Sequence, residues 1–235
     1  MKKALFSLSI IILFCASLSS YAQVFEHKEL ANLLGYHSDV LENKLLTQSE
    51  RIAIEKYSAY STAYYEDINP YLRGQAVDYQ YVKDEKEMKF LIKEIDSGLS
   101  RLPALPKNLV LFRGEGLSYR GNKPHQLGEI ISQLAYISTS SSLKEAKDFI
   151  TLNGTLFILY STQKKFKGIV MNEGETEVLL PRAQFLKIMK TRRMKDDGRK
   201  ENAYVALVQV CETKTTCESH ISNPHALKIW ENDEF

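Results

Sequence analysis

The sequence predicts an α+β fold, because its helical and strand patterns occupy different parts of the chain. Apolar residues recur at helical spacing between residues 47 and 98, whereas short apolar runs typical of strands follow from residue 108 onward. Helices that come first and strands that come afterwards favour an α+β domain over alternating βαβ units. Neither an internal repeat nor a low-complexity linker divides the chain, so we expect one domain over residues 23–235.

The first 22 residues are predicted to be a secretory signal peptide. Lys2 and Lys3 precede a largely apolar run at residues 4–14, and Ser20-Tyr21-Ala22 provides small residues at the cleavage positions. We therefore expect cleavage between Ala22 and Gln23 and a secreted protein. No later apolar run is long enough to span a bilayer, so we expect no membrane span.

The charge balance indicates that nucleic acid is not the partner. Loss of Lys2 and Lys3 lowers the number of basic residues from 31 to 29, which equals the 29 acidic residues. Non-specific nucleic-acid binding needs an excess of Lys and Arg to neutralise phosphates. The basic segment 187–200 contains the turn sequence Asp196-Asp197-Gly198, so we interpret it as a solvated hairpin tip.

The cysteines predict a disulfide rather than a metal site. Cys15 leaves with the signal peptide, and Cys211 and Cys217 remain as an even pair in an oxidising compartment. Two cysteines alone do not supply the four ligands of a structural zinc site. We therefore expect a short disulfide-closed loop and no bound metal.

Two helices are predicted in the N-terminal part. Thr47-Gln-Ser-Glu50 is a capping box, and the helix that it opens is expected to end before Asn69-Pro70 because the residue before a proline avoids the α conformation. A second helix is expected from Asp84, with Gly98 as its C-cap.

Strands and one short helix follow. Ser142-Leu-Lys-Glu145 is a further capping box, which is expected to open a helix that runs through Phe149. Strands are predicted at residues 108–112, 130–137, 155–161, 168–170, 175–180, 185–189 and 204–210.

Two glutamates at the start of one predicted strand are unusual. If the strand begins at Glu175, its two-residue period places Glu175 and Glu177 on the same face. Like charges held side by side repel each other, so a purely structural strand would avoid this pair. The apolar residues 178–180 follow directly, which places the pair at the mouth of a buried strand. The structural alternative is an exposed acidic strand end.

Polar residues also follow two other predicted strands. Arg113-Gly114 comes after the strand at 108–112, and an arginine fork beside a glycine suits a phosphate, although a surface cation is the simpler alternative. Ser138-Thr139-Ser140 comes after the strand that ends at residue 137. A serine run alone is more typical of a loop or a helix cap.

The order Arg113, Ser138-Thr139-Ser140 and Glu175-x-Glu177 resembles the bacterial arginine-specific mono-ADP-ribosyltransferase toxins of the R-S-E class, in particular the small single-domain Vis type. The similarity extends to the helical segment 68–73, to Phe149 and to Glu177-Val-Leu-Leu-Pro-Arg182, and it covers most of the chain beyond the predicted signal peptide.

The resemblance implies a fold with N-terminal helices packed on a two-sheet mixed β core. It also implies NAD as co-substrate and no metal. The partners would be NAD and a protein with an acceptor arginine, and the protein would act as a monomeric toxin. Glu177 would stabilise the cation that forms as nicotinamide leaves, and Ser138 would orient Glu177. Glu175 would orient the acceptor arginine and accept its proton.

The same resemblance assigns the remaining contacts with NAD. Arg113 would hold the phosphates, and the backbone of Gly114 and the ring of Phe149 would contact the nicotinamide. The helical residues implied to grip the adenosine and phosphates are Tyr60, Tyr65, Asn69 and Arg73.

Other functions stay open on the sequence alone. The same fold could act mainly as an NAD glycohydrolase, or the chain could be a non-catalytic exported binding module. A two-carboxylate glycosidase fits less well, because carboxylates two residues apart on one strand approach a bond from one side whereas glycosidases flank it.

Overall fold

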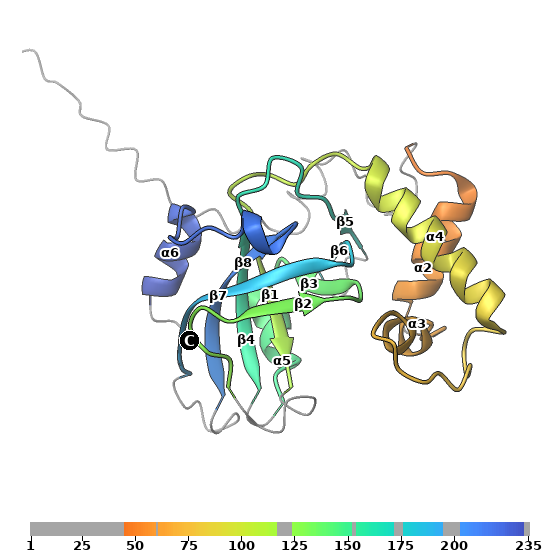
Figure 1. The fold of residues 1–235 in the computed structure, drawn as a ribbon, viewed down its shortest axis with the longest axis horizontal. Coiled ribbons are helices and arrows are strands. Elements are labelled where there is room, and N and C mark those ends of the chain that lie inside the picture. Colours follow the sequence, from red (N-terminus) through yellow and green to blue (C-terminus); the bar gives the residue numbers. More distant parts are fainter. Residues whose placement is uncertain are drawn as a thin grey trace, which may run out of the picture.

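A computed structural model of the 235-residue chain describes residues 45–59, 61–116, 124–151, 154–171, 176–194 and 203–232. The predicted signal peptide, Tyr60, Glu175 and the turn at 196–198 lie outside these residues. The elements below are labelled as in Figure 1.

Three helices form a group on one side of the molecule: α2 (Gln48–Ser58), α3 (Tyr65–Leu72) and α4 (Glu85–Arg101) (Figure 1). The predicted capping box opens α2. The Thr47 hydroxyl accepts a hydrogen bond from the Glu50 amide at 3.2 Å, and the Glu50 carboxylate accepts one from the Thr47 amide at 2.8 Å. The start of this helix is therefore confirmed.

The predicted end of the first helix is wrong. The helix α2 ends at Ser58, and a separate helix, α3, contains Asn69-Pro70. A proline removes one backbone donor from a helix. Tertiary contacts hold α3 in spite of this loss, because the buried carboxylate of Asp67 accepts hydrogen bonds from the amides of Tyr81 at 2.7 Å and Val82 at 2.8 Å.

Gly98 lies inside α4 rather than at its C-cap, so that prediction is also wrong. A Cβ atom at this position would lie 3.0 Å from Cδ1 of Ile54 and 3.3 Å from Cδ2 of Leu46. The glycine therefore serves the close approach of α2 and α4 instead of ending the helix.

The strands form a mixed sheet. In the part of the chain that the structure describes, the order is β2-β7-β8-β4-β1-β3-β6-β5; β4 and β8 are parallel, and every other pair is antiparallel. The strands are β1 (Val110–Glu115), β2 (Ile130–Gln133), β3 (Ile137–Ser140), β4 (Thr155–Ser161), β5 (Ile169–Val170), β6 (Glu177–Leu180), β7 (Gln184–Arg193) and β8 (Tyr204–Cys211).

The two-sheet core takes the form of two strand groups joined at one point. Strands β2, β7, β8, β4 and β1 form one group, strands β3, β6 and β5 form the other, and the pair Phe112–Ser140 links them. The predicted strand at 130–137 is wrong: β2 ends at Gln133, and β3 begins at Ile137 and includes the serine run that was expected to follow the strand. The two strands lie in different groups, since β2 pairs with β7 and β3 pairs with β6.

Apolar cores cover both faces of the larger strand group. Every residue of β4 is buried, and the strand alternates between the two cores. Phe157 and Leu159 belong to the core that includes α2 and α4. Leu156 and Ile158 belong to a second core with α5 (Leu143–Asp148) and α6 (Pro224–Glu231). Figure 1 shows α6 on the opposite side of the sheet from α2–α4.

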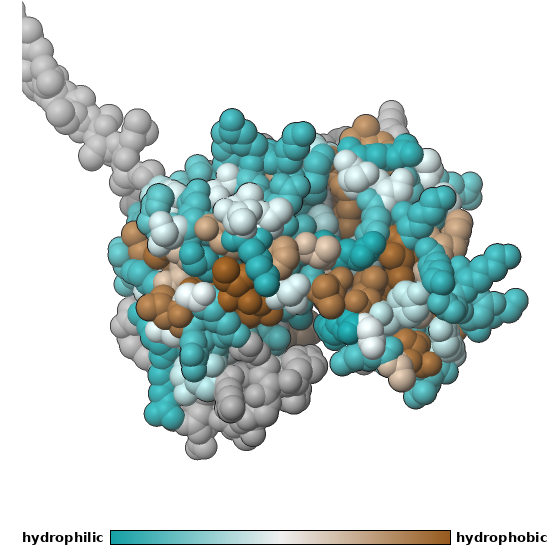
Figure 2. Space-filling model, viewed as in Figure 1, coloured by the Kyte–Doolittle hydropathy of each residue, from teal (hydrophilic) through white to brown (hydrophobic). Residues whose placement is uncertain are grey.

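The end of β8 is closed by the predicted disulfide. Cys211 and Cys217 are bonded, with their Cα atoms 5.4 Å apart, and the short 3-10 helix Lys214–Thr216 lies in the loop between them. Among the described helices, none is long and apolar enough to cross a membrane. Figure 2 shows a largely hydrophilic surface in this view, with apolar residues in separate patches.

Candidate active site

A cleft of about 750 Å³ lies between α2 and α3 on one side and β1, β3, β6 and the end of α5 on the other. This volume is in the range of small-molecule and cofactor sites. Eight of the predicted site residues line the cleft: Tyr65, Asn69, Arg73, Arg113, Gly114, Ser138, Phe149 and Glu177. The other two, Tyr60 and Glu175, lie outside the described residues.

Arg113 lies in the second half of β1, where the strand passes from the buried core into the cleft. Its Nη1 donates a hydrogen bond of 2.6 Å to the backbone carbonyl of Ser138, which fixes the guanidinium beside β3. Its Nε is buried and has no hydrogen-bond partner within the described part of the chain. A buried donor without a partner is costly.

Gly114 follows Arg113 at the point where β1 passes closest to the end of α5. A Cβ atom on Gly114 would lie 2.3 Å from the carbonyl oxygen of Ala146 and 2.8 Å from the carbonyl carbon of Phe149. Both are backbone atoms and cannot rotate away. The glycine is therefore required for this approach, which also brings Phe149 to the cleft.

Strands β3 and β6 place the serines beside the glutamate. In their antiparallel ladder Ser140 lies opposite Glu177, and Ser138 lies opposite Leu179. The residue that directly faces Glu177 is thus Ser140, the last serine of the Ser-Thr-Ser run. All three residues of the run line the cleft. The middle residue, Thr139, is buried and donates from its hydroxyl to the Val178 carbonyl at 2.5 Å.

The pairing of Glu175 and Glu177 on one strand face is not supported. Strand β6 begins at Glu177, and the preceding Thr176 has a φ angle of 47°. This is the left-handed region, not the extended conformation of a strand. The two-residue period therefore stops at Glu177, and the prediction of a strand from residue 175 is wrong.

The helical wall of the cleft is fixed by aromatic residues. The hydroxyl of Tyr57 donates to the side-chain oxygen of Asn69 at 3.0 Å, and the Tyr57 ring packs edge-on against Tyr65 with centroids 6.5 Å apart. Arg73 is the C-cap of α3, so its side chain starts from the end of this wall. Phe149, the C-cap of α5, lies across the cleft and is 56% exposed, which leaves its ring free to stack on a ligand.

Charges from both walls act on Tyr57. Burial raises the pKa of its hydroxyl above the ordinary value, and the negative charge of Glu177 raises it further, whereas Arg113 and Arg73 oppose the shift. Tyr57 therefore stays protonated and can donate a hydrogen bond at any physiological pH. The opposing effects also show that the two arginines and the glutamate lie within electrostatic reach of one point in the cleft.

The cleft contains further residues that the sequence patterns did not indicate. Tyr57, Glu66, Glu115 and Thr151 line it beside the predicted residues. Glu115 could have been found, because the two-residue strand period places it on the same face as Arg113. Tyr57 matches an apolar helical pattern and gave no sign of a role in a site.

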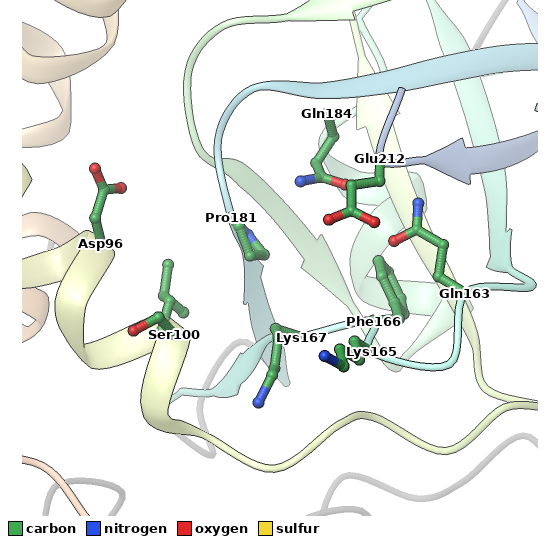
Figure 3. A pocket seen from close by; sticks show the side chains of 10 residues that line it. Asp96, Ser100, Gln163, Lys165, Phe166, Lys167, Pro181, Gln184 and Glu212 are labelled. Atoms are coloured by element: carbon green, nitrogen blue, oxygen red, sulfur yellow. The ribbon is translucent and has the colours of Figure 1, made fainter. Parts of the chain in front are cut away.

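A second cavity, of about 220 Å³, lies where α4 meets the segment 163–167 (Figure 3). Asp96 and Ser100 project from α4 on one side, and Gln184 and Glu212 lie on the other. None of the predicted site residues lines it. No group of three or more His, Cys, Asp or Glu suited to a metal occurs in the described ranges.

Solved structures of ADP-ribosyltransferase toxins share this fold. The Vis toxin, an ADP-ribosyltransferase from Vibrio splendidus, is 20% identical over 81% of this chain and 85% of its own, with a TM-score of 0.57. A complex of Vis with agmatine is 22% identical over 82% of this chain and 88% of its own, with a TM-score of 0.58. An ADP-ribosyltransferase from Clostridium botulinum is 21% identical over 79% of this chain and 94% of its own, with a TM-score of 0.57. The ADP-ribosylating toxin BECa of C. perfringens, solved with NADH, is 16% identical over 78% of this chain and 46% of its own, with a TM-score of 0.58.

The fold is thus that of the ADP-ribosyltransferases whose structures are solved. No curated protein sequence matched the chain. The family model of the ADP-ribosyltransferase exoenzymes matches residues 27–210, which is most of the chain. The chain belongs to the ADP-ribosyltransferase exoenzyme family.

Proposed function

We propose that the chain is a secreted mono-ADP-ribosyltransferase that moves ADP-ribose from NAD to an arginine of a target protein and releases nicotinamide. One observation carries this proposal: a single cleft gathers Arg113, Ser138 and Glu177 from β1, β3 and β6. These residues are far apart in the sequence, yet the sheet order brings their strands side by side.

The cleft fits a dinucleotide with a pyrophosphate. Arg113 and Arg73 supply cations from opposite walls. The exposed ring of Phe149 offers a stacking surface for the nicotinamide, and Tyr65 and Asn69 extend the helical wall for the adenosine. The solved structure of BECa with NADH is consistent with a nucleotide of this type.

Glu177 is the proposed catalytic residue. When the bond between nicotinamide and ribose breaks, nicotinamide leaves as a neutral molecule and positive charge develops on the ribose carbon. A fixed carboxylate stabilises that charge, as carboxylates do in glycoside cleavage. Glu177 suits this role because it is half-buried at the start of β6, where the ladder with β3 holds its backbone.

Glu175 is the proposed acceptor-binding residue. A guanidinium is protonated at physiological pH and does not attack carbon as a cation. A neighbouring carboxylate can orient it and accept the proton as the new bond forms. The complex of Vis with agmatine supports an arginine-like acceptor. In the absence of an acceptor, water would attack the same carbon, and slow NAD hydrolysis would result.

Secretion is part of the proposal and rests on Lys2, Lys3 and the apolar run that follows them. The disulfide between Cys211 and Cys217 suits an oxidising compartment. N-terminal sequencing of the protein from the culture medium should show a chain that starts at Gln23. Recovery of the uncleaved chain only inside the cells would contradict this part.

Two variants test the roles of the glutamates. Glu175→Ala should abolish transfer to agmatine but retain appreciable NAD hydrolysis, because the ribose still meets Glu177. Glu177→Ala should abolish both reactions. Transfer and nicotinamide release are measured with labelled NAD. Glu55→Ala, at an exposed position of α2, is the matched control and should retain both reactions. Retention of transfer by either active-site variant, or NAD hydrolysis at the same rate in both, would refute the assignment.

A further inference from the structure

We propose that Thr176 is a positioning residue, whose hydroxyl bond to Ser140 holds the left-handed turn from which Glu177 enters the cleft. The inference rests on the proposed function of Glu177 and assigns a role to the residue between the two glutamates. It is carried by one unusual backbone angle and by three hydrogen bonds that surround it.

The backbone angle at Thr176 needs an explanation. Thr176 has a φ of 47°, a region that L-residues with a branched Cβ rarely occupy. Such conformations are strained and persist only where the surroundings hold them, often at functional sites. The strain here lies immediately before Glu177, so the surroundings that hold Thr176 also set the direction in which β6 begins.

The turn is anchored to the segment after β3. The hydroxyl oxygens of Thr176 and Ser140 are 2.6 Å apart, and the Ser140 hydroxyl also accepts a hydrogen bond from the Ser142 amide at 2.9 Å. The backbone carbonyl of Thr176 accepts a hydrogen bond from the Ser141 amide at 3.0 Å. The side chain of Thr176 is therefore held by Ser140, and its carbonyl is held by the next residue, Ser141.

Ser140 connects this anchor to the catalytic carboxylate. It is the ladder partner of Glu177 and the hydroxyl partner of Thr176. A shift of Thr176 away from Ser140 would therefore displace the first residue of β6. This gives the last serine of the run a role of its own, distinct from that of Ser138, and it explains why a hydroxyl residue precedes Glu177.

The test compares variants that differ only in the hydroxyl. Thr176→Val keeps the branched shape and removes the anchor, so kcat for nicotinamide release should fall about tenfold or more, because small displacements of a reacting group are costly. The KM for NAD should change less than threefold, since Arg113 and the helical wall are untouched. Thr176→Ser keeps the hydroxyl and should recover most of the lost rate.

A double-variant cycle identifies the partner. Ser140→Ala should lower kcat at least as much as Thr176→Val, because it also removes the bond from the Ser142 amide. The double variant should be no slower than Ser140→Ala alone, because the Thr176 change then removes a bond that is already lost. Thr191→Val is the matched control. It makes the same exchange on β7, where the hydroxyl has no hydrogen-bond partner among the described residues, and it should leave kcat unchanged.

Strain and anchoring can be separated with Thr176→Gly. Glycine adopts a positive φ freely, so this variant should not lower the melting temperature through strain. It still lacks the hydroxyl, and its kcat should fall as in Thr176→Val. A Thr176→Gly enzyme with the wild-type kcat would show that the hydroxyl is not needed.

The outcomes separate this inference from the proposed function. If the wild type turns over NAD and Thr176→Val does so at the same rate, Thr176 is not a positioning residue. If the wild type is inactive, the proposed function fails instead, and amide exchange at Ser141 still decides the anchor. Exchange should accelerate at least tenfold in Thr176→Val; an unchanged rate would overturn the anchor irrespective of catalysis.

Discussion

The guanidinium of Arg182 forms a two-pronged ion pair with the carboxylate of Asp96. Nε donates to Oδ1 at 3.0 Å, and Nη2 donates to Oδ2 at 2.7 Å. The hydroxyl of Tyr136 donates to the same carboxylate at 2.8 Å. Asp96 lies on α4, whereas Arg182 follows β6 after one residue, so the pair connects α4 to the strand that starts with Glu177.

The ion pair therefore has a defined place relative to the cleft. Asp96 also lines the smaller cavity in Figure 3, on the seam between α4 and the sheet. Hydrogen bonding to Asp96 raises the pKa of Arg182, which keeps the guanidinium charged. We expect this contact to hold α4, and α2 that packs against it at Gly98, at their distance from β6.

Loss of the Arg182 side-chain charge should destabilise the protein modestly. Arg182→Met keeps the aliphatic stem and removes both hydrogen bonds, and it should lower the free energy of unfolding by about 1–2 kcal/mol, a small value because both side chains are about one-third exposed. Urea unfolding measures this change. Lys89→Met, which removes a fully exposed pair with Glu85, is the control and should leave the free energy of unfolding almost unchanged. Equal costs would contradict a special role for Arg182.

Gly114→Ala should damage both stability and NAD binding. The added Cβ would overlap the backbone of Ala146 and Phe149, so the end of α5 must move. Overpacking of this kind costs about 1–3 kcal/mol. Because Phe149 moves with the helix end, the KM for NAD should also rise.

Gly128→Ala is the matched control for this prediction. Gly128 has a φ of 81°, and no atom lies within 4 Å of its Cβ position, so alanine there costs only the backbone strain, about 1–2 kcal/mol. Thermal melts and NAD kinetics measure both variants. A normal KM in Gly114→Ala would show that the approach of β1 to α5 does not position Phe149.

Stability should fall in acid partly through Glu50. Burial raises the pKa of this carboxylate, but hydrogen bonds from the Ser97 hydroxyl and the Thr47 amide, together with Arg101, outweigh burial and hold the pKa below its ordinary value. A pKa that is lower in the folded than in the unfolded state adds stability above the unfolded value of 4.5, and this stability is lost as the pH falls through the folded value.

The matching measurement is the melting temperature between neutral pH and about pH 3, a range that spans the ordinary pKa of a glutamate. The melting temperature of the wild type should fall on acidification, and Glu50→Gln should start lower and show a weaker dependence on pH. Glu55→Gln, at an exposed position of the same helix, should follow the wild type. Parallel curves for wild type and Glu50→Gln would contradict the prediction.

Local patterns predicted much of the fold. The capping box at Thr47 and the strand at residues 155–161 depend on neighbouring residues, and both are confirmed. Errors arise where a distant contact overrides a local preference. Gly98 stays helical because Ile54 packs against it, and Pro70 is accommodated in α3 because Asp67 is anchored elsewhere. The helix α6 was missed although Asn223-Pro224 is a typical helix start.

In the site, too, local sequence patterns predicted some features, whereas features that depend on distant contacts were missed. The sequence order of Arg113, Ser138 and Glu177 predicted which residues gather, and all three line the cleft. The register between β3 and β6, which places Ser140 opposite Glu177, depends on strand pairing that no local pattern encodes. The positive φ of Thr176 was likewise hidden, since threonine is typical of strands.

The most direct test of the proposed function is incubation of residues 23–235 with labelled NAD, with and without agmatine. We expect nicotinamide release together with labelled ADP-ribosyl-agmatine, slower nicotinamide release without agmatine, and neither product with Glu177→Gln. Absence of both nicotinamide release and labelled agmatine from the folded wild-type protein would contradict the proposal and favour a non-catalytic binding module.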